Sequence, residues 1–329
     1  MSKHIIDVIV NVYNEEKNIR NFLESLLTQT YTDFRLVIVD DGSTDRTIDL
    51  ATEYLDLLPL EILCLPHAGL RGARAKAVEA VQADIFIVFD ADQVIDKFAI
   101  ERFVEAFHDT TVGAVTGRKI SLGNTWTERG NRVVTEIAFN ALNKNGNSEQ
   151  LSGGCFACRT QPVREFGGFS GFDKHAEDSE LTWRLQETGW RTIARDDIIV
   201  YHQDPSGSLS MIKWGARMGR LGVYTRMKYK EKLFRWHFLI RFSILILLIV
   251  ALFNPVVAFI GLFANLLLFL MKARATDASL QDKLYGWSVF TLKSFGWSLA
   301  FCKVLVEYLF NQWQGIDVVQ AESDGKVGS

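Results

Sequence analysis

The chain has 329 residues, 48% of them hydrophobic, which is enough for one large domain with additional elements or for two domains. Its formal net charge of −3 provides no general basic surface, and we expect no nucleic-acid partner. Four cysteines fit a reducing compartment. Cys155 and Cys158 have the spacing of a zinc-binding pair. No second Cys/His pair accompanies them, so we expect no zinc site.

Short apolar runs alternate with amphipathic helical patterns along the first part of the chain. We expect strands at residues 4–12, 35–39, 61–65 and 85–89, with helices at 19–27, 44–58 and 73–81 between them. Because residues 1–7 lead straight into a strand, we expect no N-terminal signal peptide. The pattern predicts an α/β fold with a mostly parallel central sheet and helices on both faces.

The later part of this region continues the alternation. The sequence predicts a strand at 112–120, a polar helical region to about residue 147, and loop and strand between Gly153 and Gly168. A helix is expected at 177–187, where Leu181 and Leu185 recur behind an acidic start. A last short strand is expected at 198–201.

Polar clusters follow the predicted strands at the end where parallel sheets bind their ligands. Tyr13-Asn14-Glu15 follows the first strand, Asp40-Asp41 the second and Asp90-Ala91-Asp92 the fourth. Carboxylates separated by one residue, such as Asp90 and Asp92, suit Mg²⁺ or Mn²⁺ that also grips a diphosphate. A solvated loop is the alternative, but the position directly after a buried strand favours the metal.

Residues 238–271 are almost wholly apolar, with Arg241 as the only charge. One straight helix of this length would reach about 51 Å, beyond the ~30 Å hydrocarbon core of a bilayer. The Asn254-Pro255 pair therefore predicts a hairpin of two short helices or one kinked helix. A further stretch at 287–310 contains Lys293, Lys303 and Glu307. It could span or lie in the interface, and spanning is preferred.

Basic residues gather just before this apolar region, and Glu231 is the one acid among them: Lys213, Arg217, Arg220, Arg226, Lys228, Lys230, Lys232, Arg235 and Arg241. Such residues mark the cytoplasmic side of a span and attract anionic lipids; a solvated helical face is the alternative. We expect a catalytic domain at 1–205, an interfacial segment at 206–237, a membrane region of about two or three helices at 238–312 and a polar, disordered tail at 313–329.

Several sequence motifs occur in a recognisable order: Val12-Tyr13-Asn14-Glu15-Glu16, Val37-Ile38-Val39-Asp40-Asp41-Gly42-Ser43-Thr44-Asp45, Ala73-Arg74, Phe89-Asp90-Ala91-Asp92, Gly153-Gly154 with Arg159, Gly167-Gly168-Phe169, and Glu177-Asp178 with Trp183-Arg184-Leu185. With these motifs, roughly residues 5–205 resemble family 2 glycosyltransferases of the GT-A nucleotide-sugar-binding fold. The resemblance implies a membrane-associated, metal-dependent transferase that inverts the anomeric centre of a UDP- or GDP-sugar.

The resemblance places Tyr13, Glu15, Asp40 and Asp41 in the nucleoside pocket. From the residues alone, Asp40 and Asp41 can accept hydrogen bonds from a nucleobase or ribose, while Ser43 or Asp45 caps the next helix. Glu15 has the alternative of interacting only with a helix dipole, and its contact with the nucleoside is left open.

Two arginines begin the third predicted helix, where positive charge opposes the helix dipole. A pyrophosphate partner would explain Arg71 and Arg74; a solvated basic turn is the alternative. Arg217 or Arg220 could clamp the diphosphate in the same way. The Gln-x-x-Arg-Trp signature of processive synthases is absent around them, so we expect one or few sugar additions per encounter.

Asp90 and Asp92 are the predicted ligands of Mg²⁺ or Mn²⁺, with His202 as a third ligand or an ordinary surface histidine. Asp178, beside Glu177, is the predicted catalytic base by resemblance. A sugar hydroxyl needs a group to accept its proton, and a carboxylate at the acceptor site meets that need. Two acids that only serve a helix dipole are the alternative.

The predicted reaction moves a sugar to a hydroxyl of a membrane-associated, lipid-linked glycan or glycolipid, on the cytoplasmic face of a multi-pass membrane protein. The Glu177-Asp178 pair favours a hydroxyl acceptor, because a phosphate acceptor is already an anion and needs no base. A polyprenyl-phosphate glycosyltransferase similar to dolichyl-phosphate mannose synthases is the first alternative. A non-catalytic sugar-nucleotide-binding scaffold is the second. No Gly-x-Gly-x-x-Gly follows the first strand, so a Rossmann dehydrogenase is not expected.

Overall fold

The computed structural model describes residues 6–67, 69–144, 146–171, 177–228 and 237–313. The chain forms two compact units. The first comprises Met1–Leu122 with Ala138–Gln203, and the second comprises Gly123–Ile137 with Asp204–Ser329. The predicted tail from residue 314 onward and the basic residues at 229–236 lie outside the described residues.

The first unit is built on one mixed sheet with strand order β3-β2-β1-β4-β9-β6-β10-β8-β7, in which β5 also pairs with β10. Strands β1 (Ile6–Val12), β2 (Phe34–Asp40), β3 (Leu60–Cys64) and β4 (Ile85–Asp90) are mutually parallel. Strand β9 (Cys155–Arg159) lies antiparallel between β4 and β6 (Val112–Ser121). Strand β10 (Arg191–His202) is parallel to β6 and antiparallel to β5 (Gln93–Ile95) and β8 (Asn147–Ser148), which pairs with β7 (Asn143–Lys144).

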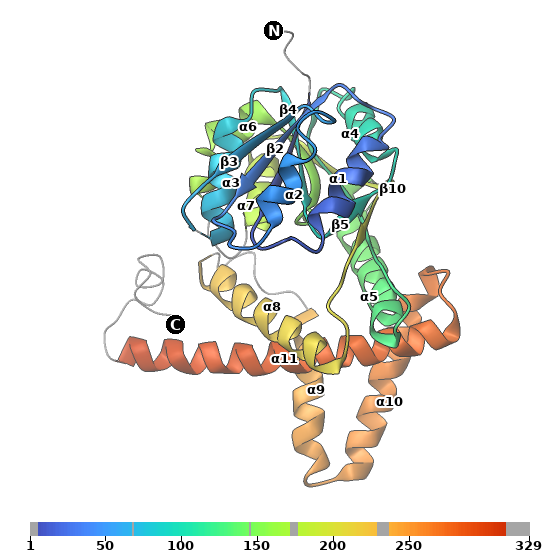
Figure 1. The fold of residues 1–329 in the computed structure, drawn as a ribbon. Helices are drawn as coiled ribbons and strands as arrows, with labels where there is room; N and C mark the ends of the chain where they lie inside the picture. Colours follow the sequence, from blue (N-terminus) through green and yellow to red (C-terminus); the bar gives the residue numbers. More distant parts are fainter. Residues whose placement is uncertain (1–5, 68, 145, 172–176, 229–236, 314–329) are drawn as a thin grey trace. The chain divides into compact units, whose positions relative to one another are not determined.

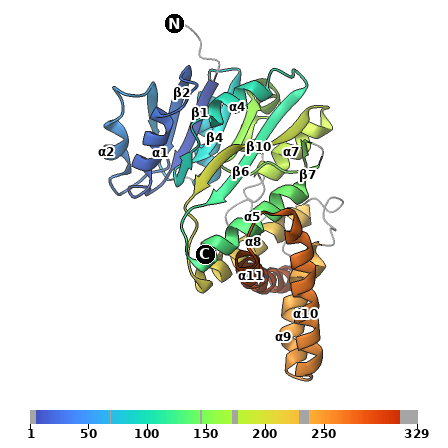
Figure 2. The same ribbon diagram turned by 90° about the vertical axis from the view of Figure 1, so that its right-hand side faces the viewer.

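Helices cover both faces of this sheet (Figures 1 and 2). Successive strand residues point to opposite faces. Val8 and Val10 therefore pack with α1 (Ile19–Leu27), α2 (Thr47–Thr52) and α4 (Ala99–Ala106). Ile9 faces the other layer, formed by α3 (Gly69–Ala80), α6 (Thr160–Glu165), the 3-10 turn η1 (Gly168–Gly171) and α7 (Glu177–Glu187). The expected α/β sandwich with helices on both faces is confirmed.

The predicted fold class is confirmed, and the sheet within it is mixed: the five-residue strand β9 enters antiparallel at its centre. Two element boundaries were wrong. The helix predicted at 44–58 is only α2, and turns follow it to residue 58. The last strand is much longer than predicted: β10 begins at Arg191 and continues past irregular pairing between Ala194 and Ile199.

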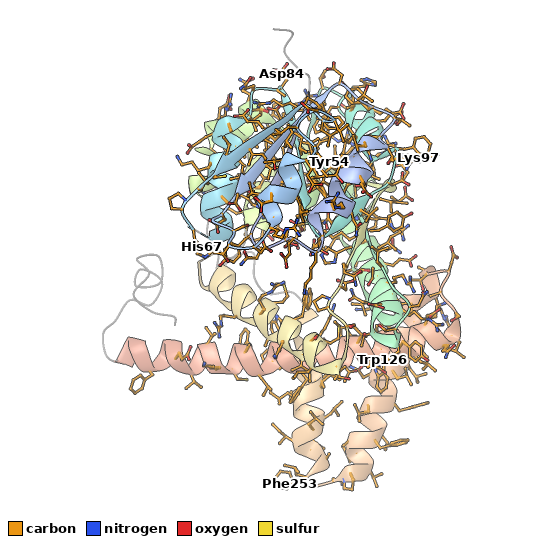
Figure 3. The ribbon with its side chains drawn as sticks, viewed as in Figure 1. Tyr54, His67, Asp84, Lys97, Trp126 and Phe253 are labelled. Atoms are coloured by element: carbon orange, nitrogen blue, oxygen red, sulfur yellow. The ribbon has the colours of Figure 1, made fainter. Side chains whose placement is uncertain are left out.

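The carboxyl ends of the four parallel strands lie at one end of the sheet. Figure 3 shows this by two labelled residues at opposite ends of the unit: Asp84, which precedes β4, and His67, which follows β3. The polar clusters found in the sequence follow β1, β2 and β4, so all of them are delivered to the same end as His67.

The second unit is helical. It contains the first part of α5 (Trp126–Leu142), then α8 (Ser208–Lys228), α9 (His237–Ala251), α10 (Pro255–Lys272), η3 (Ala273–Ala275) and α11 (Leu280–Trp313). Helices α8 and α11 pack along much of their length, at a distance only glycine allows: a Cβ at Gly215 would lie 2.1 Å from the Lys293 carbonyl oxygen.

The apolar region folds as two helices, α9 and α10, that lie side by side (Figure 1). Asn254 separates them and caps α10, its side-chain oxygen accepting a 3.1 Å hydrogen bond from the Val257 N–H, with Pro255 at the first helical position. The hairpin form of the prediction is therefore confirmed. Among the described residues, Pro255–Ala275 is the one helix long and apolar enough to cross a membrane.

Candidate functional site

The loops after β1 and β2 hold one another in place. Asn14 has a positive φ of 56°, which asparagine tolerates better than most residues. This conformation lets its N–H donate to Ser43 Oγ at 2.9 Å while its Oδ1 accepts from the Thr44 N–H at 2.8 Å. Asp45 accepts from the Glu16 and Thr47 N–H groups. The motifs at 12–16 and 37–45 thus form one fixed platform.

Asp40 and Asp41 are both buried at the end of β2. Both oxygens of the Asp40 carboxylate accept from the Ser43 N–H, at 3.1 and 3.2 Å. Asp41 Oδ2 accepts from the Gly69 N–H at 2.9 Å and lies 2.9 Å from His67 Nδ1. Asp41 therefore ties β2 to the start of α3. Whether it also binds a nucleoside stays a prediction.

An aromatic pair lies beside Asp41. The rings of Tyr13 and His67 are 4.5 Å apart between centroids and tilted by 35°, and both side chains are about half exposed. A nucleobase can stack on an exposed ring of this kind, with stacking worth about 1–3 kcal/mol per base. Tyr13 was predicted at this position, whereas His67 was not.

Asp90 ends β4 between two cations. Lys119 Nζ donates a 3.1 Å hydrogen bond to its Oδ2, and Arg74 Nη2 lies 3.6 Å from its Oδ1. Burial raises the pKa of Asp90, but the charges of Lys119 and Arg74 outweigh this and leave the pKa below its ordinary value. Burial likewise lowers the pKa of Lys119, and Asp90 reverses the shift. Both groups are charged at neutral pH.

Asp92 lies on the turn between β4 and β5. Its Oδ2 is 3.1 Å from His202 Nε2, and its backbone carbonyl accepts from the Gln203 N–H, so β5 and the end of β10 fix its position. Its other oxygen, Oδ1, is buried and has no hydrogen-bond partner in the part of the chain that the structure describes. Buried polar atoms are normally paired, so an unpaired carboxylate oxygen is consistent with a cation ligand.

Glu15 adds a third carboxylate to this region. Burial raises its pKa, and the negative charges of Asp92 and Asp90 raise it further, against a hydrogen bond from Asn18 that lowers it. The charges of Asp90 and Asp92 act on Glu15 because the three carboxylates lie near one another. The Glu15 backbone carbonyl accepts from the N–H groups of Asn18 and Ile19 at the start of α1, and the role of its carboxylate stays a prediction.

Gly153 and Gly154 lie between Asp90 and Asp178. A Cβ added to Gly154 would be 1.8 Å from Asp90 Oδ2, and one added to Gly153 would be 3.1 Å from Asp178 Oδ2. Since consecutive Cα atoms are about 3.8 Å apart, the two carboxylates are no more than about 12 Å from each other. The structure thus brings Asp178, at the start of α7, to the same end of the sheet as Asp90.

For the other predicted site residues the structure gives only their positions on helices. The backbone of Arg71 and Glu177 starts α3 and α7, but their side chains lie outside the described residues. Arg217 and Arg220 lie on α8 in the second unit, where both side chains are exposed. Their roles stay predictions.

The side chains near Asp90 and Asp92 are the candidate ligands for Mg²⁺ or Mn²⁺. Among the described residues, no three His, Cys, Asp or Glu side chains are grouped so that they could hold a metal ion. The chemistry of the residues nevertheless fits a hard divalent cation: Asp90 and Asp92 provide carboxylate oxygens, and Asp92 Oδ1 is unpaired. His202 contacts Asp92 and stays a predicted third ligand.

The cysteine pair does not form a site. Cys155 packs with the core under α1 and α4, whereas Cys158, three residues along the same strand, packs with the opposite core. Two side chains on opposite faces of a strand cannot share one metal ion. Burial raises the pKa of the Cys155 thiol to about 12 and that of Cys158 well above its ordinary value, so both stay protonated.

Lys119 and Gln93 were missed in the sequence. Lys119 lies in a run that reads as an apolar strand, and Gln93 immediately follows the Asp-x-Asp motif. Gln93 is buried, its Oε1 accepts from the Asp90 N–H at 3.3 Å, and its Nε2 lies 3.4 Å from Asp90 Oδ2. For Gln93, the available signal was a long polar side chain directly after the Asp-x-Asp motif.

The fold and this strand-end cluster define an α/β protein of the GT-A-like class. Residues 7–167 match the family described as Glycosyl transferase family 2, so this segment is a glycosyltransferase family 2 domain. The chain is similar to mannosyltransferase PcManGT from Pyrobaculum calidifontis, solved with GDP-Man and Mn²⁺. The TM-score is 0.59 at 21% identity, with 91% of this chain and 87% of that chain covered, which supports the same fold.

Two sequence relatives carry related names. The chain is 28% identical over 246 residues to the probable glycosyltransferase YdaM of Bacillus subtilis, covering 70% of this chain and 58% of that protein. It is 33% identical over 162 residues to hyaluronan synthase of Streptococcus pyogenes, covering 46% of this chain and 38% of the synthase. The chain thus spans only part of the length of these relatives.

Proposed function

We propose that the protein is a glycosyltransferase that moves a sugar from a UDP- or GDP-sugar to a hydroxyl of a membrane-associated, lipid-linked glycan or glycolipid, with inversion at the anomeric carbon. One observation carries this proposal. The Gly153-Gly154 segment brings Asp178 to the same end of the sheet as the Asp90 cluster. An acid pair for the donor diphosphate and a carboxylate for the acceptor are the two parts this reaction needs.

The platform formed by the loops after β1 and β2 is the proposed nucleoside site. The exposed faces of Tyr13 and His67 offer a stacking surface. Asp40 and Asp41, at the end of β2, are the proposed acceptors of hydrogen bonds from the nucleobase or ribose. The diphosphate would then lie toward Arg74 and Lys119, both of which carry positive charge beside Asp90. A diphosphate in this position would compensate the positive charge of Arg74, which is buried near the start of α3.

Asp90 and Asp92 would hold Mg²⁺ or Mn²⁺ together with oxygens of the donor diphosphate, and His202, beside Asp92, stays the third ligand predicted from the sequence. A cation there neutralises the charge that develops on the departing nucleoside diphosphate. The structures of relatives give independent support for a metal, because PcManGT was solved with Mn²⁺ and GDP-Man.

Asp178 is the proposed base. As the acceptor oxygen forms its bond to the anomeric carbon, the bond from that carbon to the diphosphate oxygen breaks, and the hydroxyl proton passes to the Asp178 carboxylate. The leaving diphosphate keeps the bonding electron pair. Asp178 is partly exposed, and its Oδ1 accepts a 3.2 Å hydrogen bond from the N–H of the neighbouring Ser179. An acceptor hydroxyl can therefore reach it.

A membrane acceptor is supported by the second unit. Exposed basic side chains lie along α8 at Lys213, Arg217 and Arg220, and α10 is apolar and long. Positive charge next to an apolar helix favours the cytoplasmic face, where nucleotide sugars are made available.

The experiment has two stages. Thermal unfolding is followed with UDP-glucose, UDP-GlcNAc and GDP-mannose, each with Mn²⁺; one donor should raise the melting temperature, since ligands that bind the folded state stabilise it. That donor, radiolabelled, is then offered with a glycosylated polyprenyl diphosphate or with polyprenyl phosphate. Transfer to the glycosylated lipid, lost in Asp178→Asn with donor stabilisation intact, supports the proposal.

Each alternative has its own outcome. Transfer to polyprenyl phosphate at full rate by Asp178→Asn would show a phosphate acceptor and remove the base role. Donor stabilisation without transfer or donor hydrolysis would indicate a sugar-nucleotide-binding scaffold. Arg191→Gln, on the exposed ion pair with Asp109, is the matched control and should change neither measurement.

A further inference from the structure

The hairpin of α9 and α10 exposes an unusually large apolar surface. Its side chains are well over one third exposed at Ile246, Leu248, Ile249, Leu252, Phe253, Val256, Val257, Phe259, Ile260, Phe263, Leu267, Leu268 and Met271. Soluble monomers rarely expose contiguous patches of this size, and larger ones mark partners or membranes. The surface is present on both helices and on the turn between them.

The first leg of the hairpin is too short to cross a bilayer. From Arg241 to Phe253 the chain rises about 18 Å, against a hydrocarbon core of about 30 Å. Extending the leg backward would carry Arg241 into the core, and a charged residue near the centre of a bilayer is strongly disfavoured. Among the described residues, the apolar helix in this leg is the short one at Phe242–Ala251.

The turn has the wrong composition for a crossing hairpin. A turn that emerged on the far side would lie in water, yet Leu252 is 81% exposed and Phe253 is 85% exposed. The only polar side chain there, Asn254, uses its oxygen to cap α10 through the Val257 N–H. The turn is therefore suited to hydrocarbon.

Polar contacts mark where the hairpin leaves the apolar medium. Asn265 of α10 donates to Ser243 Oγ of α9 at 3.3 Å and accepts from the Trp287 indole N–H of α11 at 3.0 Å. Tryptophan favours the boundary between hydrocarbon and headgroups. From Asn265 back to Pro255 the helix rises only about 15 Å, half the core thickness. Figure 1 shows α9 and α10 projecting together from α11 in this unit.

Positive charge lies further toward the base of the hairpin, about 10 Å along α10 from Asn265. Lys272 and Arg274 follow the apolar part of α10 and are both exposed. Basic residues beside an inserted segment attract anionic headgroups. The base of the hairpin therefore matches a phospholipid surface in charge, and the tip matches acyl chains.

From these observations we propose that the α9–α10 hairpin is re-entrant: it inserts into one leaflet of a phospholipid bilayer, turns near the midplane and returns to the same side. Both ends of the hairpin, and the helices joined to them, then face one aqueous compartment. This replaces the multi-pass arrangement expected from hydropathy. It does not depend on the proposed reaction.

The test measures depth at successive positions of the full-length protein in liposomes of phosphatidylcholine and phosphatidylglycerol. Cys64 and Cys302 are replaced by serine, while Cys155 and Cys158 are fully buried and remain. Single cysteines are then introduced by Phe253→Cys, Phe259→Cys and Phe263→Cys, all at exposed sites, and spin-labelled. Ser279→Cys, at the exposed base of α11, is the aqueous control.

Oxygen and a nickel chelate collide with spin labels in hydrocarbon and in water, respectively. The proposal predicts the largest oxygen-to-nickel ratio at residue 253, with a steady fall through residues 259 and 263 to the control. A crossing hairpin gives its maximum near residue 263 and a nickel-accessible turn at 253, which would overturn the proposal. Nickel access at all four positions would also overturn it, because the hairpin would then not enter lipid.

Discussion

Lys119 Nζ lies 3.1 Å from Asp90 Oδ2, so the first acid of the Asp-x-Asp motif is paired with a cation from strand β6. Arg74 approaches the other oxygen of the same carboxylate from α3. Three segments distant in the chain thus meet at one carboxylate. In the proposed reaction these cations would also face the diphosphate of the donor.

Replacing Lys119 should destabilise the fold as well as weaken donor binding. Lys119→Met removes the charge but keeps the length of the side chain, leaving Asp90 with Arg74 alone. Because the pair is only partly buried, we expect a loss of about 1–3 kcal/mol in the free energy of unfolding by urea. Lys76→Met breaks an exposed ion pair with Glu79 and should cost less than about 0.5 kcal/mol. Equal effects from both variants would argue against the pairing.

Gly154→Ala should abolish donor binding. The new Cβ would lie 1.8 Å from Asp90 Oδ2, and Gly154 also has a positive φ of 69°. Gly189→Ala separates backbone strain from the clash with Asp90, since Gly189 has a φ of 88° but an added Cβ would have nothing within 4 Å. Both variants should lose about 1–2 kcal/mol from backbone strain. Only Gly154→Ala should lose thermal stabilisation by the donor; retention of that stabilisation would contradict the site.

Asp92→Asn should weaken metal binding. Its unpaired Oδ1 becomes part of a neutral amide, a poorer ligand for Mg²⁺ or Mn²⁺. Binding of Mn²⁺ by electron paramagnetic resonance should fall at least tenfold, and excess EDTA should stop transfer by the unaltered protein until Mn²⁺ is restored. Asp109→Asn, on the exposed pair with Arg191, is the control and should bind Mn²⁺ normally. Full activity in EDTA would exclude a metal-dependent reaction.

Cys155 makes the fold sensitive to alkaline pH. Burial raises its pKa from 9.0 to about 12. Because the folded-state pKa is the higher one, its contribution is fully present below pH 9 and is lost as the pH rises toward 12. The loss reaches about 4 kcal/mol at most. Cys155→Ala should show a shallower fall in unfolding free energy over this range, as measured by urea titration at each pH. Parallel curves for the two proteins would contradict the shift.

Much of the first unit could be predicted from the sequence because its signals are local. The run Ile85–Phe89 is uninterrupted and apolar. In the helix between β1 and β2, the apolar residues recur at helical spacing. The αβ alternation then fixes which strand ends meet, and with them the positions of Tyr13, Asp40 and Asp90. Asp178 also lies where the α7 pattern placed it, at the first turn of that helix.

The parts that escaped prediction depend on contacts between distant segments. Loop and strand were both expected between Gly154 and Gly167, but nothing local marks Cys155–Arg159 as the strand that pairs antiparallel with β4. The helix after β2 begins later than predicted, where Thr47 and Asp45 accept hydrogen bonds from the Glu15 and Glu16 N–H groups of the loop after β1. The Lys119–Asp90 pair depends on the order of strands in the sheet, in which β9 alone separates β6 from β4.

The position of β9 also has a consequence for biosynthesis. Phe86 of β4 pairs with Cys158, so the centre of the sheet stays open until a much later stretch has left the ribosome. Until then one flank of β4 and one of β6 present unsatisfied backbone groups, which invite association with other nascent chains. Long-range pairings of this kind slow folding. Protein made at a reduced temperature, or with added chaperones, should therefore give a higher soluble yield.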